Sequence, residues 1–165
     1  NLRVSSTPIQ KFSEEDFDFV LSMFYVVNHI LYLGDLLEYF KQVRKRLSPS
    51  GIFVFDCWNG IAAIRDLPKA NDRTRFKNAK TEVRTSCYPE VDLMNSFVKM
   101  SNKTEILEAS GEYNFYNEEL NHVLWTPKVL KDALAISGFK SVECHKTYTQ
   151  EKCSENDFKI VFVCR

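Results

Sequence analysis

The chain has 165 residues, and its 22 Lys and Arg are balanced by 22 Asp and Glu, so the formal net charge is zero. At this length one domain buries enough apolar surface to fold without disulfide bonds, which argues against a small disulfide scaffold. A neutral chain has no general attraction for phosphate backbones, so we expect no nucleic-acid partner. Hydrophobic residues at 44% and charged residues at 27% are ordinary globular values and argue against disorder.

The longest apolar stretch, residues 23–33, is interrupted by Asn28 and His29. It is far shorter than the roughly 20 residues that a membrane span needs, so no membrane association is expected. The first residues lack the basic and apolar regions of a secretory signal. The five cysteines are widely spaced without a CxxC pair, which predicts reduced, mostly buried thiols in a cytoplasmic protein.

The first half of the chain alternates strand and helix patterns, which is typical of a parallel sheet covered by helices. Residues 17–24 form a nearly continuous apolar run and predict a central strand buried on both faces. Residues 35–47 carry apolar positions at helical spacing and predict an amphipathic helix with Asp35 as its N-cap. The Ser-Pro-Ser-Gly sequence of residues 48–51 is expected to turn the chain into a second buried strand at 52–55.

The pattern changes after about residue 74, where apolar residues alternate with polar ones. This alternation predicts three successive antiparallel strands at 75–87, 91–100 and 104–116. We expect the first turn at 88–90 and the second at 101–103. The result would be an antiparallel meander inserted into an α/β protein.

A last amphipathic helix is predicted over residues 126–137. Thr126 is suited to the N-cap, Pro127 follows in the first turn, and Gly138 is suited to the C-terminal stop. Two closing strands are then expected at 140–149 and 158–164.

Three segments together resemble a known family. They are FDFVLSMFYVVNH at residues 17–29, LSPSGIFVFD at 47–56, and the segment from Leu124-Trp125-Thr126-Pro127 to Ser137-Gly138-Phe139. This set is similar to the C-terminal part of class I S-adenosylmethionine-dependent methyltransferases. The resemblance implies an α/β fold: a Rossmann-like methyltransferase sheet, without its N-terminal strands, that carries the inserted antiparallel β-meander. It implies a single partial domain over residues 1–165, with 68–124 as the insertion.

The insertion further resembles a subgroup of small-molecule methyltransferases, which includes enzymes that methylate amino groups of nucleotide-linked sugars. This resemblance implies S-adenosylmethionine as cofactor and a small-molecule acceptor with an amine or hydroxyl group. The inserted sheet would cover the acceptor pocket or form a homodimer contact. Such an analogy constrains the substrate class only weakly.

Methyl transfer is an in-line displacement, so the enzyme must hold the acceptor in near-attack geometry and remove a proton where necessary. By resemblance, four residues lie against the cofactor: Ser22, Met23, Phe24 and Tyr25. Asn28 and His29 would face the acceptor, and His29 is the best candidate for a general base because imidazole titrates near neutrality. An equally weighted alternative is a loop histidine that hydrogen-bonds to backbone.

Three further residues are candidates for the acceptor side. Asp56 would orient the acceptor or a loop, or else cap local backbone amides. Trp58, like Trp125, would form a pocket wall or belong to the core. Tyr116, together with Tyr113 and His122, would reach the acceptor from the insertion, although surface or dimer packing explains these residues equally well.

Two groups of charged residues have simpler interpretations. Glu118, Glu119 and His122 fall in a predicted loop and strand, where their spacing does not suit a metal, so no metal site is expected. The basic residues near the end of the first helix are expected to be solvated: Lys41, Arg44, Lys45 and Arg46.

The sequence departs from the family pattern at its start. None of the five glycines forms a GxG pair, and the similarity begins near a predicted third strand at residues 2–5. Thr7-Pro8-Ile9-Gln10 stands where an acidic residue commonly contacts the adenine. We therefore expect a fragment of a longer enzyme, an enzyme whose first half is cleaved or disordered, or a truncated homologue that has lost catalysis. The last alternative would act as a dimerisation or interaction module.

Overall fold

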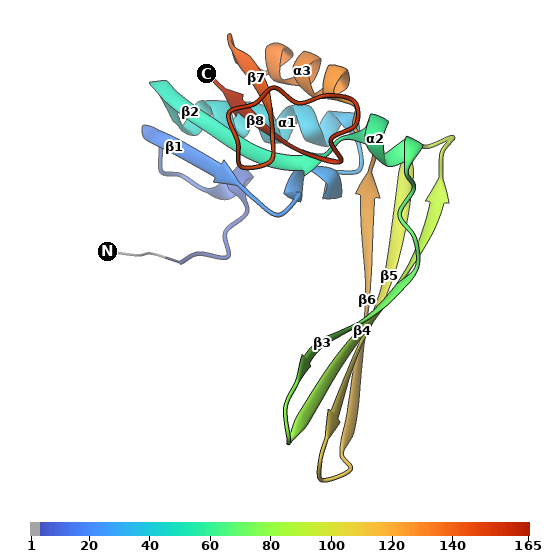
Figure 1. Cartoon of the computed structure of the whole chain (residues 1–165). Helices are drawn as coiled ribbons and strands as arrows, with labels where there is room; N and C mark the ends of the chain where they lie inside the picture. The colour runs from blue at the N-terminus through green and yellow to red at the C-terminus, as the bar shows by residue number, and fades with distance from the viewer. Residues whose placement is uncertain (1–3) are drawn as a thin grey trace.

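The computed structural model describes residues 4–165, which fold into two four-stranded sheets (Figure 1). The core sheet contains β1 (Phe17–Ser22), β2 (Leu47–Trp58), β8 (Lys159–Cys164) and β7 (Val142–Lys146), in that order. β1 and β2 are parallel, whereas β8 is antiparallel to both β2 and β7. The apolar runs at 17–24 and 52–55 therefore correspond to two parallel strands, as predicted.

Helices α1 (Leu33–Arg46) and α3 (Pro127–Ile136) supply side chains to the main hydrophobic core. On α1, Leu36, Phe40 and Val43 are fully buried, because they recur at helical spacing on the side that meets the core sheet. The ring of Phe40 packs against Phe53 and Phe55 of β2, with centroids 6.1 and 5.6 Å apart. This packing fixes the position of β2 and of the residues that follow it.

The start of α1 differs from the prediction. The helix begins at Leu33, so Asp35 lies in its first turn instead of at the N-cap. A carboxylate in the first turn is favourable because it faces the positive end of the helix dipole. The end also differs: Arg46 is buried rather than solvated, and its Nε donates a hydrogen bond of 3.1 Å to the carbonyl of Phe12. Phe12 follows the short 3₁₀ helix η1 (Ile9–Lys11).

Residues 48–51 do not form a separate turn, because β2 already begins at Leu47. The pairing with β1 is irregular there: it moves from Phe17 with Leu47 to Phe19 with Ile52. The Ser-Pro-Ser-Gly residues are thus accommodated as an irregularity within the strand.

The C-terminal elements follow the sequence pattern closely. Thr126 caps α3 by accepting a hydrogen bond of 3.3 Å from the backbone nitrogen of Val129. After the helix, Gly138 has a φ of +97°, a left-handed conformation that glycine adopts without strain. The predicted closing strands are shorter than expected, at Val142–Lys146 and Lys159–Cys164.

β1 is buried on one face only, which contradicts the expectation of a strand covered on both sides. Val20 packs against the main core, whereas Phe19 and Leu21 are 64% and 65% exposed. β1 is also the edge strand of the core sheet among the described residues. The predicted strand at residues 2–5 falls partly outside the described residues, and Val4 and Ser5 are not in a strand.

The second sheet is a meander that projects away from the core sheet as an arm (Figure 1). It contains four antiparallel strands, β3 (Asn71–Lys77), β4 (Thr81–Asp92), β5 (Phe97–Glu108) and β6 (Tyr113–Val123). These strands lie within residues 68–124, the range of the expected insertion. Among the described residues the arm therefore has four strands, whereas the alternation of apolar and polar residues in the sequence predicts three.

Both predicted turns of the meander are wrong. Residues 88–90 lie in β4 and residues 101–103 lie in β5. Pro89 is tolerated in β4 because β3 pairs with β4 only as far as Cys87, so Pro89 lies where one side of β4 is an edge. Asn102 is paired on both sides, with Cys87 and Glu118.

Helix α2 (Gly60–Arg65) joins the core sheet to the arm. Gly60 donates its backbone N–H to the carbonyl of Trp125 at 3.0 Å, and a Cβ at this position would lie 2.2 Å from the carbonyl oxygen of Leu124. Only glycine therefore allows this close approach. None of the described helices has the length and apolarity to cross a membrane.

Candidate active site

The candidate site lies where β1 and β2 end side by side. Their parallel register pairs Ser22 with Phe55, so the residues that follow both strands leave the same edge of the core sheet. Ligands of open α/β sheets bind beyond such carboxyl ends. Directly after β1, Phe24 and Tyr25 have positive φ angles of 66° and 64°. This conformation is unfavourable for large side chains and persists only where the surroundings hold it.

Asp56 holds this loop. Its side chain is 1% exposed, and Oδ1 accepts a hydrogen bond of 2.9 Å from the backbone nitrogen of Tyr25. A hydrogen bond to an ionised carboxylate is stronger than one between neutral groups. Of the predicted roles of Asp56, the geometry favours orientation of a loop over the capping of local amides, because the amide that Asp56 binds belongs to a segment distant in sequence.

Asn28 ties together three parts of the chain. It is fully buried in the 3₁₀ helix η2 (Val26–His29). Its Nδ2 donates to the carbonyl of Val123 at 2.8 Å, and its Oδ1 accepts from the backbone nitrogen of Trp58 at 2.9 Å. Because backbone groups occupy both ends of the amide, Asn28 positions η2 against β2 and β6 and is not itself directed at an acceptor.

His29 lies next to Asn28 and is exposed. Its Nδ1 is 3.0 Å from the carbonyl oxygen of Asn121. Since a carbonyl only accepts, this contact requires the proton on Nδ1. The Nε2 atom then carries a lone pair, and it makes no hydrogen bond to any described residue. This is the tautomer that a general base needs.

His122 and Trp58 form a stack behind His29. Their rings are nearly parallel, with an angle of 9° and centroids 4.5 Å apart, and the centroids of His122 and His29 are 4.3 Å apart. His122 is 6% exposed, and its buried Nδ1 has no hydrogen-bond partner among the described residues. Burial and then the neighbouring His29 lower the pKa of His122 from 6.5 to about 4, so it is neutral at physiological pH.

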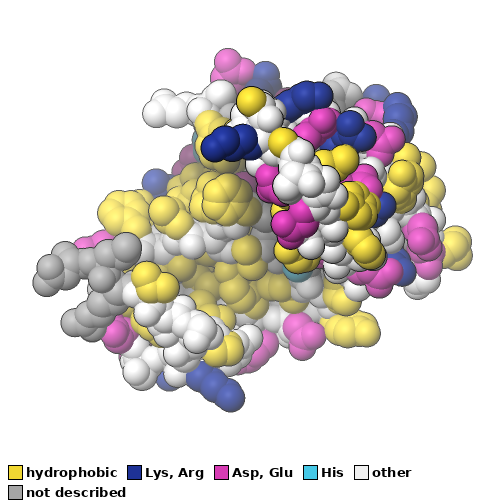
Figure 2. Space-filling view, turned by 90° about the horizontal axis from the view of Figure 1, so that it is seen from below, with side chains coloured by type: hydrophobic (Ala, Val, Ile, Leu, Met, Phe, Trp, Pro, Cys, Tyr) yellow, Lys and Arg dark blue, Asp and Glu magenta, His cyan; other side chains and the backbone are white. Residues whose placement is uncertain are grey.

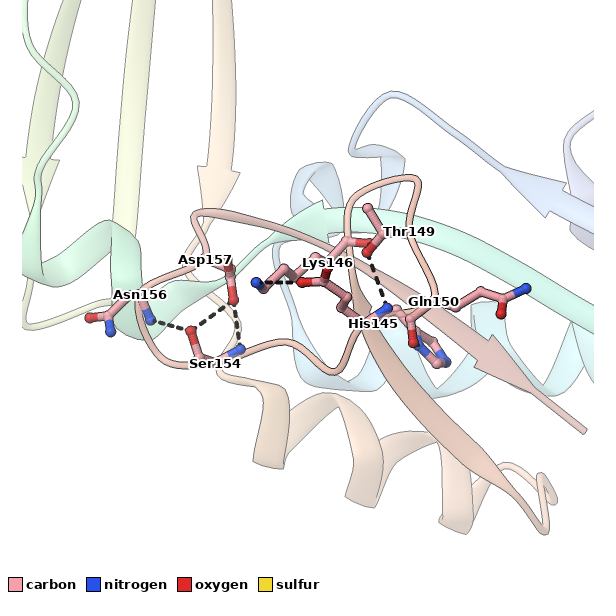
Figure 3. A network of polar contacts seen from close by, with 8 residues as sticks. His145, Lys146, Thr149, Gln150, Ser154, Asn156 and Asp157 are labelled. Atoms are coloured by element: carbon pink, nitrogen blue, oxygen red, sulfur yellow. Dashed lines mark hydrogen bonds and ion pairs between the residues drawn. The ribbon is translucent and has the colours of Figure 1, made fainter.

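The segment before β8 is a loop held together by its own polar contacts (Figure 3). Within it, Asp157 accepts hydrogen bonds of 2.7 Å from both the backbone nitrogen and the hydroxyl of Ser154. Asn59 joins this loop to the end of β2, since its Nδ2 donates to the carbonyls of Ser154 and Asp157 at 3.2 Å. Phe158 consequently packs on Trp58, with centroids 5.2 Å apart. Lys159 places its ammonium group 5.1 Å from the ring centroid of Tyr25.

The four residues expected to bind a cofactor follow one another through the end of β1. Phe24 is 82% exposed, whereas Ser22 is 7% exposed. The Ser22 hydroxyl is buried without a well-formed hydrogen bond to the described residues. Met23 and Tyr25 are half-buried. The Ser22 hydroxyl lies beside Tyr39 of α1, so the accessible apolar side chains are the part of this segment that suits a ligand.

Tyr116 lies apart from the other candidate residues. It is 63% exposed on β6, six residues from His122. At a strand rise of about 3.4 Å per residue, the two are about 20 Å apart. Within this chain, therefore, Tyr116 does not join the site around Trp58. No cluster of metal-ligating side chains occurs among residues 4–165.

Several contributors to the site are not evident in the sequence. Asn121 and Val123 contribute their backbone carbonyl groups, and no pattern of side chains in the sequence indicates such a role. Phe158 and Lys159 are the first two residues of the last predicted strand, but only the antiparallel pairing of β8 with β2 places them beside Trp58. The one available signal is that the segment connects two strands of the same sheet.

No known protein family matches the sequence, and no curated protein is similar enough to be matched. Solved structures are similar in fold. An S-adenosylmethionine-dependent methyltransferase from Clostridium acetobutylicum superposes with a TM-score of 0.81 and 17% identity, over 100% of this chain and 65% of that one. The sugar N-methyltransferase KedS8 from Streptoalloteichus gives 0.74 and 14%, over 96% and 60%. The amino pentose methyltransferase CalS10 from Micromonospora echinaspora gives 0.72 and 14%, over 96% and 62%.

The chain thus has the α/β fold seen in S-adenosylmethionine-dependent methyltransferases with a class I fold. It spans 60 to 65% of the length of these three chains. At these identities the similarity concerns the fold, so the reaction has to be argued from the residues of the site.

Proposed function

We propose that this chain takes part in methyl transfer from S-adenosylmethionine to an amine or hydroxyl group of a small molecule. The observation that carries this proposal is the orientation of His29. Its Nδ1 is fixed on the Asn121 carbonyl, its Nε2 makes no hydrogen bond to a described residue, and it belongs to η2, the segment that follows β1. An imidazole in this tautomer presents a lone pair that can accept a proton.

The bound cofactor supplies an electrophilic methyl group, and the residues of the chain bind and orient the reactants. Ser22, Met23, Phe24 and Tyr25 would contact the cofactor, and Phe24 is the most exposed of the four. Asp56 holds the strained loop in the conformation that presents these residues. His29 would take the proton from the amine or hydroxyl of the acceptor, and the cofactor, when bound, would supply the methyl group that the acceptor receives.

The acceptor side of the proposal rests on Trp58. Trp58 forms one wall of a hollow of about 430 Å³, together with Phe158, Met100 and residues 66–71. This volume is within the range of small-molecule sites, which runs from roughly 300 to 1,000 Å³. His29 does not line this hollow, so an acceptor held there would have to extend past Trp58 to reach the base. Two of the structural neighbours are named for methylation of sugar amines, which favours an amino sugar as the acceptor class.

Titration of the ¹⁵N-labelled chain with S-adenosylmethionine tests this proposal. We expect the largest shift changes at residues 22–25 and His29, with a dissociation constant near the millimolar range because the sequence contains no glycine-rich loop. His145, which lies on β7, should not respond. An absence of change at saturating cofactor, or changes confined to the arm, would contradict the proposal.

Methyl transfer itself is measured with labelled cofactor and a panel of amino sugars and simple amines. We expect His29→Gln to lower turnover by at least about 100-fold while the dissociation constant of the cofactor stays the same. Equal turnover in the variant and the parent would remove His29 from the mechanism.

The exposed edge of β1 favours a second candidate function, a non-catalytic interaction module. The outer edge of β1 has no neighbour among the described strands, and Phe19 and Leu21 are exposed, so this edge invites pairing with another chain; a second copy of this chain is the simplest partner. Light scattering combined with the cofactor titration separates the two functions. A stable dimer that does not respond to S-adenosylmethionine supports the module, and a responding monomer supports the enzyme.

A further inference from the structure

The contacts of His29 lead to a neighbour whose role is still unexplained. Three contacts and one peptide bond form a closed circuit that includes this neighbour, His122. Asn28 bonds to the backbone of Trp58, the ring of Trp58 stacks on His122, and His122 packs against His29. His29 in turn adjoins Asn28 in the sequence. A ring held in such a circuit has little freedom to rotate.

We propose that His122 is a positioning residue for His29. Its ring, stacked on Trp58, holds His29 in the orientation in which Nδ1 donates to the Asn121 carbonyl and Nε2 presents its lone pair. This inference rests on the proposed function, in which His29 is the base. It gives the arm a direct part in the site, because both His122 and Asn121 belong to β6.

The burial of His122 agrees with a positioning role and argues against direct proton transfer by this residue. Only 6% of His122 is exposed, and its Nδ1 has no hydrogen-bond partner in the described part of the chain, so an acceptor in solvent contact does not reach this nitrogen. The packing also has an electrostatic benefit. His122 is uncharged near neutral pH, so it does not repel the proton that His29 takes up.

Only a flat, uncharged ring is required at this position. Phenylalanine supplies the same stack on Trp58 and the same contact with His29, whereas alanine supplies neither. The comparison of His122→Phe with His122→Ala therefore separates positioning by packing from any chemistry of the imidazole.

The first test observes the tautomer of His29 directly. Long-range ¹H–¹⁵N spectra of the histidine-labelled chain resolve three imidazoles, since the sequence contains three histidines. We expect His29 to be protonated on Nδ1 in the parent and in His122→Phe. In His122→Ala we expect a mixture of both tautomers, with His145 unchanged as the internal control.

The outcome that would overturn the proposal is an unchanged His29 spectrum in a folded His122→Ala protein. If the alanine variant does not fold, His122→Leu takes its place, because leucine keeps apolar volume but lacks a flat ring. An unchanged His29 tautomer in that variant would overturn the proposal equally.

Kinetics provide a second readout. His122→Ala should lower kcat by about tenfold with little change in KM, because a misoriented base loses part of its contribution in the transition state. His122→Phe should restore kcat to within about twofold of the parent. Equal losses in the two variants would show that the imidazole itself is needed. A chain that transfers no methyl group would refute the proposed function, whereas the tautomer measurement would still decide the role of His122.

Discussion

His122 makes the stability of the protein depend on pH. Its pKa is about 4 in the folded state and about 6.5 when unfolded, so the unfolded chain binds more protons between these values. The free energy of unfolding should therefore be highest above pH 6.5 and fall as the pH is lowered toward 4. The loss amounts to about 3 kcal/mol at most. Urea denaturation at a series of pH values measures it.

Two variants isolate this contribution. His122→Phe has no group to titrate, so its stability should change less than that of the parent between pH 6.5 and 4. His29→Gln removes the neighbouring imidazole that helps to lower the pKa of His122, so the variant should raise this pKa and reduce the loss. The interpretation is wrong if the parent and His122→Phe show the same pH dependence in this interval.

Asp56 offers a second test at the residue scale. Asp56→Asn keeps the shape of the side chain but removes the charge from its hydrogen bond with the Tyr25 amide. We expect a loss of about 1 to 2 kcal/mol in stability and a shift of the Tyr25 amide resonance. Asp72→Asn, at an exposed position on β3, is the matched control and should change stability by less than about 0.5 kcal/mol. Equal effects of the two substitutions would contradict the role of Asp56.

At the scale of elements, the junction between β2 and α2 depends on Gly60. The methyl group of Gly60→Ala would meet the carbonyl oxygen of Leu124, a backbone atom that moves only if the entry to α3 moves. We expect a loss of at least about 2 kcal/mol. Thermal or urea unfolding measures this loss.

Gly34→Ala is the matched control for Gly60→Ala. Nothing lies within 4 Å of a Cβ at Gly34, and alanine favours helix, so this variant should be neutral or up to about 1 kcal/mol more stable. If both variants unfold like the parent, the close approach at Gly60 has no importance for stability.

The reliability of sequence patterns also differs between elements. β2 and α3 are predictable because their signals are local: an apolar run in one case, and Thr126, Pro127 and Gly138 in the other. The turns of the arm are not predictable in this way. The polar residues and the proline at 88–90 and 101–103 resemble turn residues, but they lie inside strands, and only the pairing with neighbouring strands shows this. Asp92 and Asn95 mark a real turn, since the Asp92 carboxylate accepts from Asn95, but this signal is weaker than a proline.

The residues of the site likewise divide into those with a local signal in the sequence and those whose role depends on distant parts of the chain. His29, Asn28, Asp56 and Trp58 are found from their places after strands and from a family resemblance. Their partners, such as the Asn121 carbonyl, lie far along the chain and enter through the pairing of β5 with β6. Such contacts depend on register, which a single sequence does not specify. Tyr116 fails to join the others for the same reason, since its position on β6 places it toward the far end of the arm.

For the whole molecule, the most notable surface is the apolar one at β1. Hydrophobic side chains gather in a hollow on the face seen from below, beside the arm (Figure 2). The largest exposures on β1 itself are at Phe19 and Leu21. Exposed apolar surface of this kind marks an interaction site or an aggregation risk.

We therefore expect the chain to associate at high concentration and Leu21→Lys to weaken this association. A charge on an edge strand opposes pairing with a second strand. Light scattering over a concentration series measures the effect. Met94→Lys is the control, because Met94 is 94% exposed at the distant β4–β5 turn and should leave association unchanged. A parent chain that remains monomeric throughout would contradict this expectation.

The two hydrogen bonds of Asn28 have a consequence for the order of folding. They join residues 30 and 95 positions apart in sequence, so η2 reaches its final shape only after β2 and β6 are both in place. Closing such long loops is slow compared with forming local helices. The pocket should then be the last part of the molecule to become ordered during refolding. Fluorescence of Trp58, in a chain whose Trp125 is replaced by Phe, should report a slower phase than circular dichroism, because the tryptophan acquires its final neighbours only when the arm has docked.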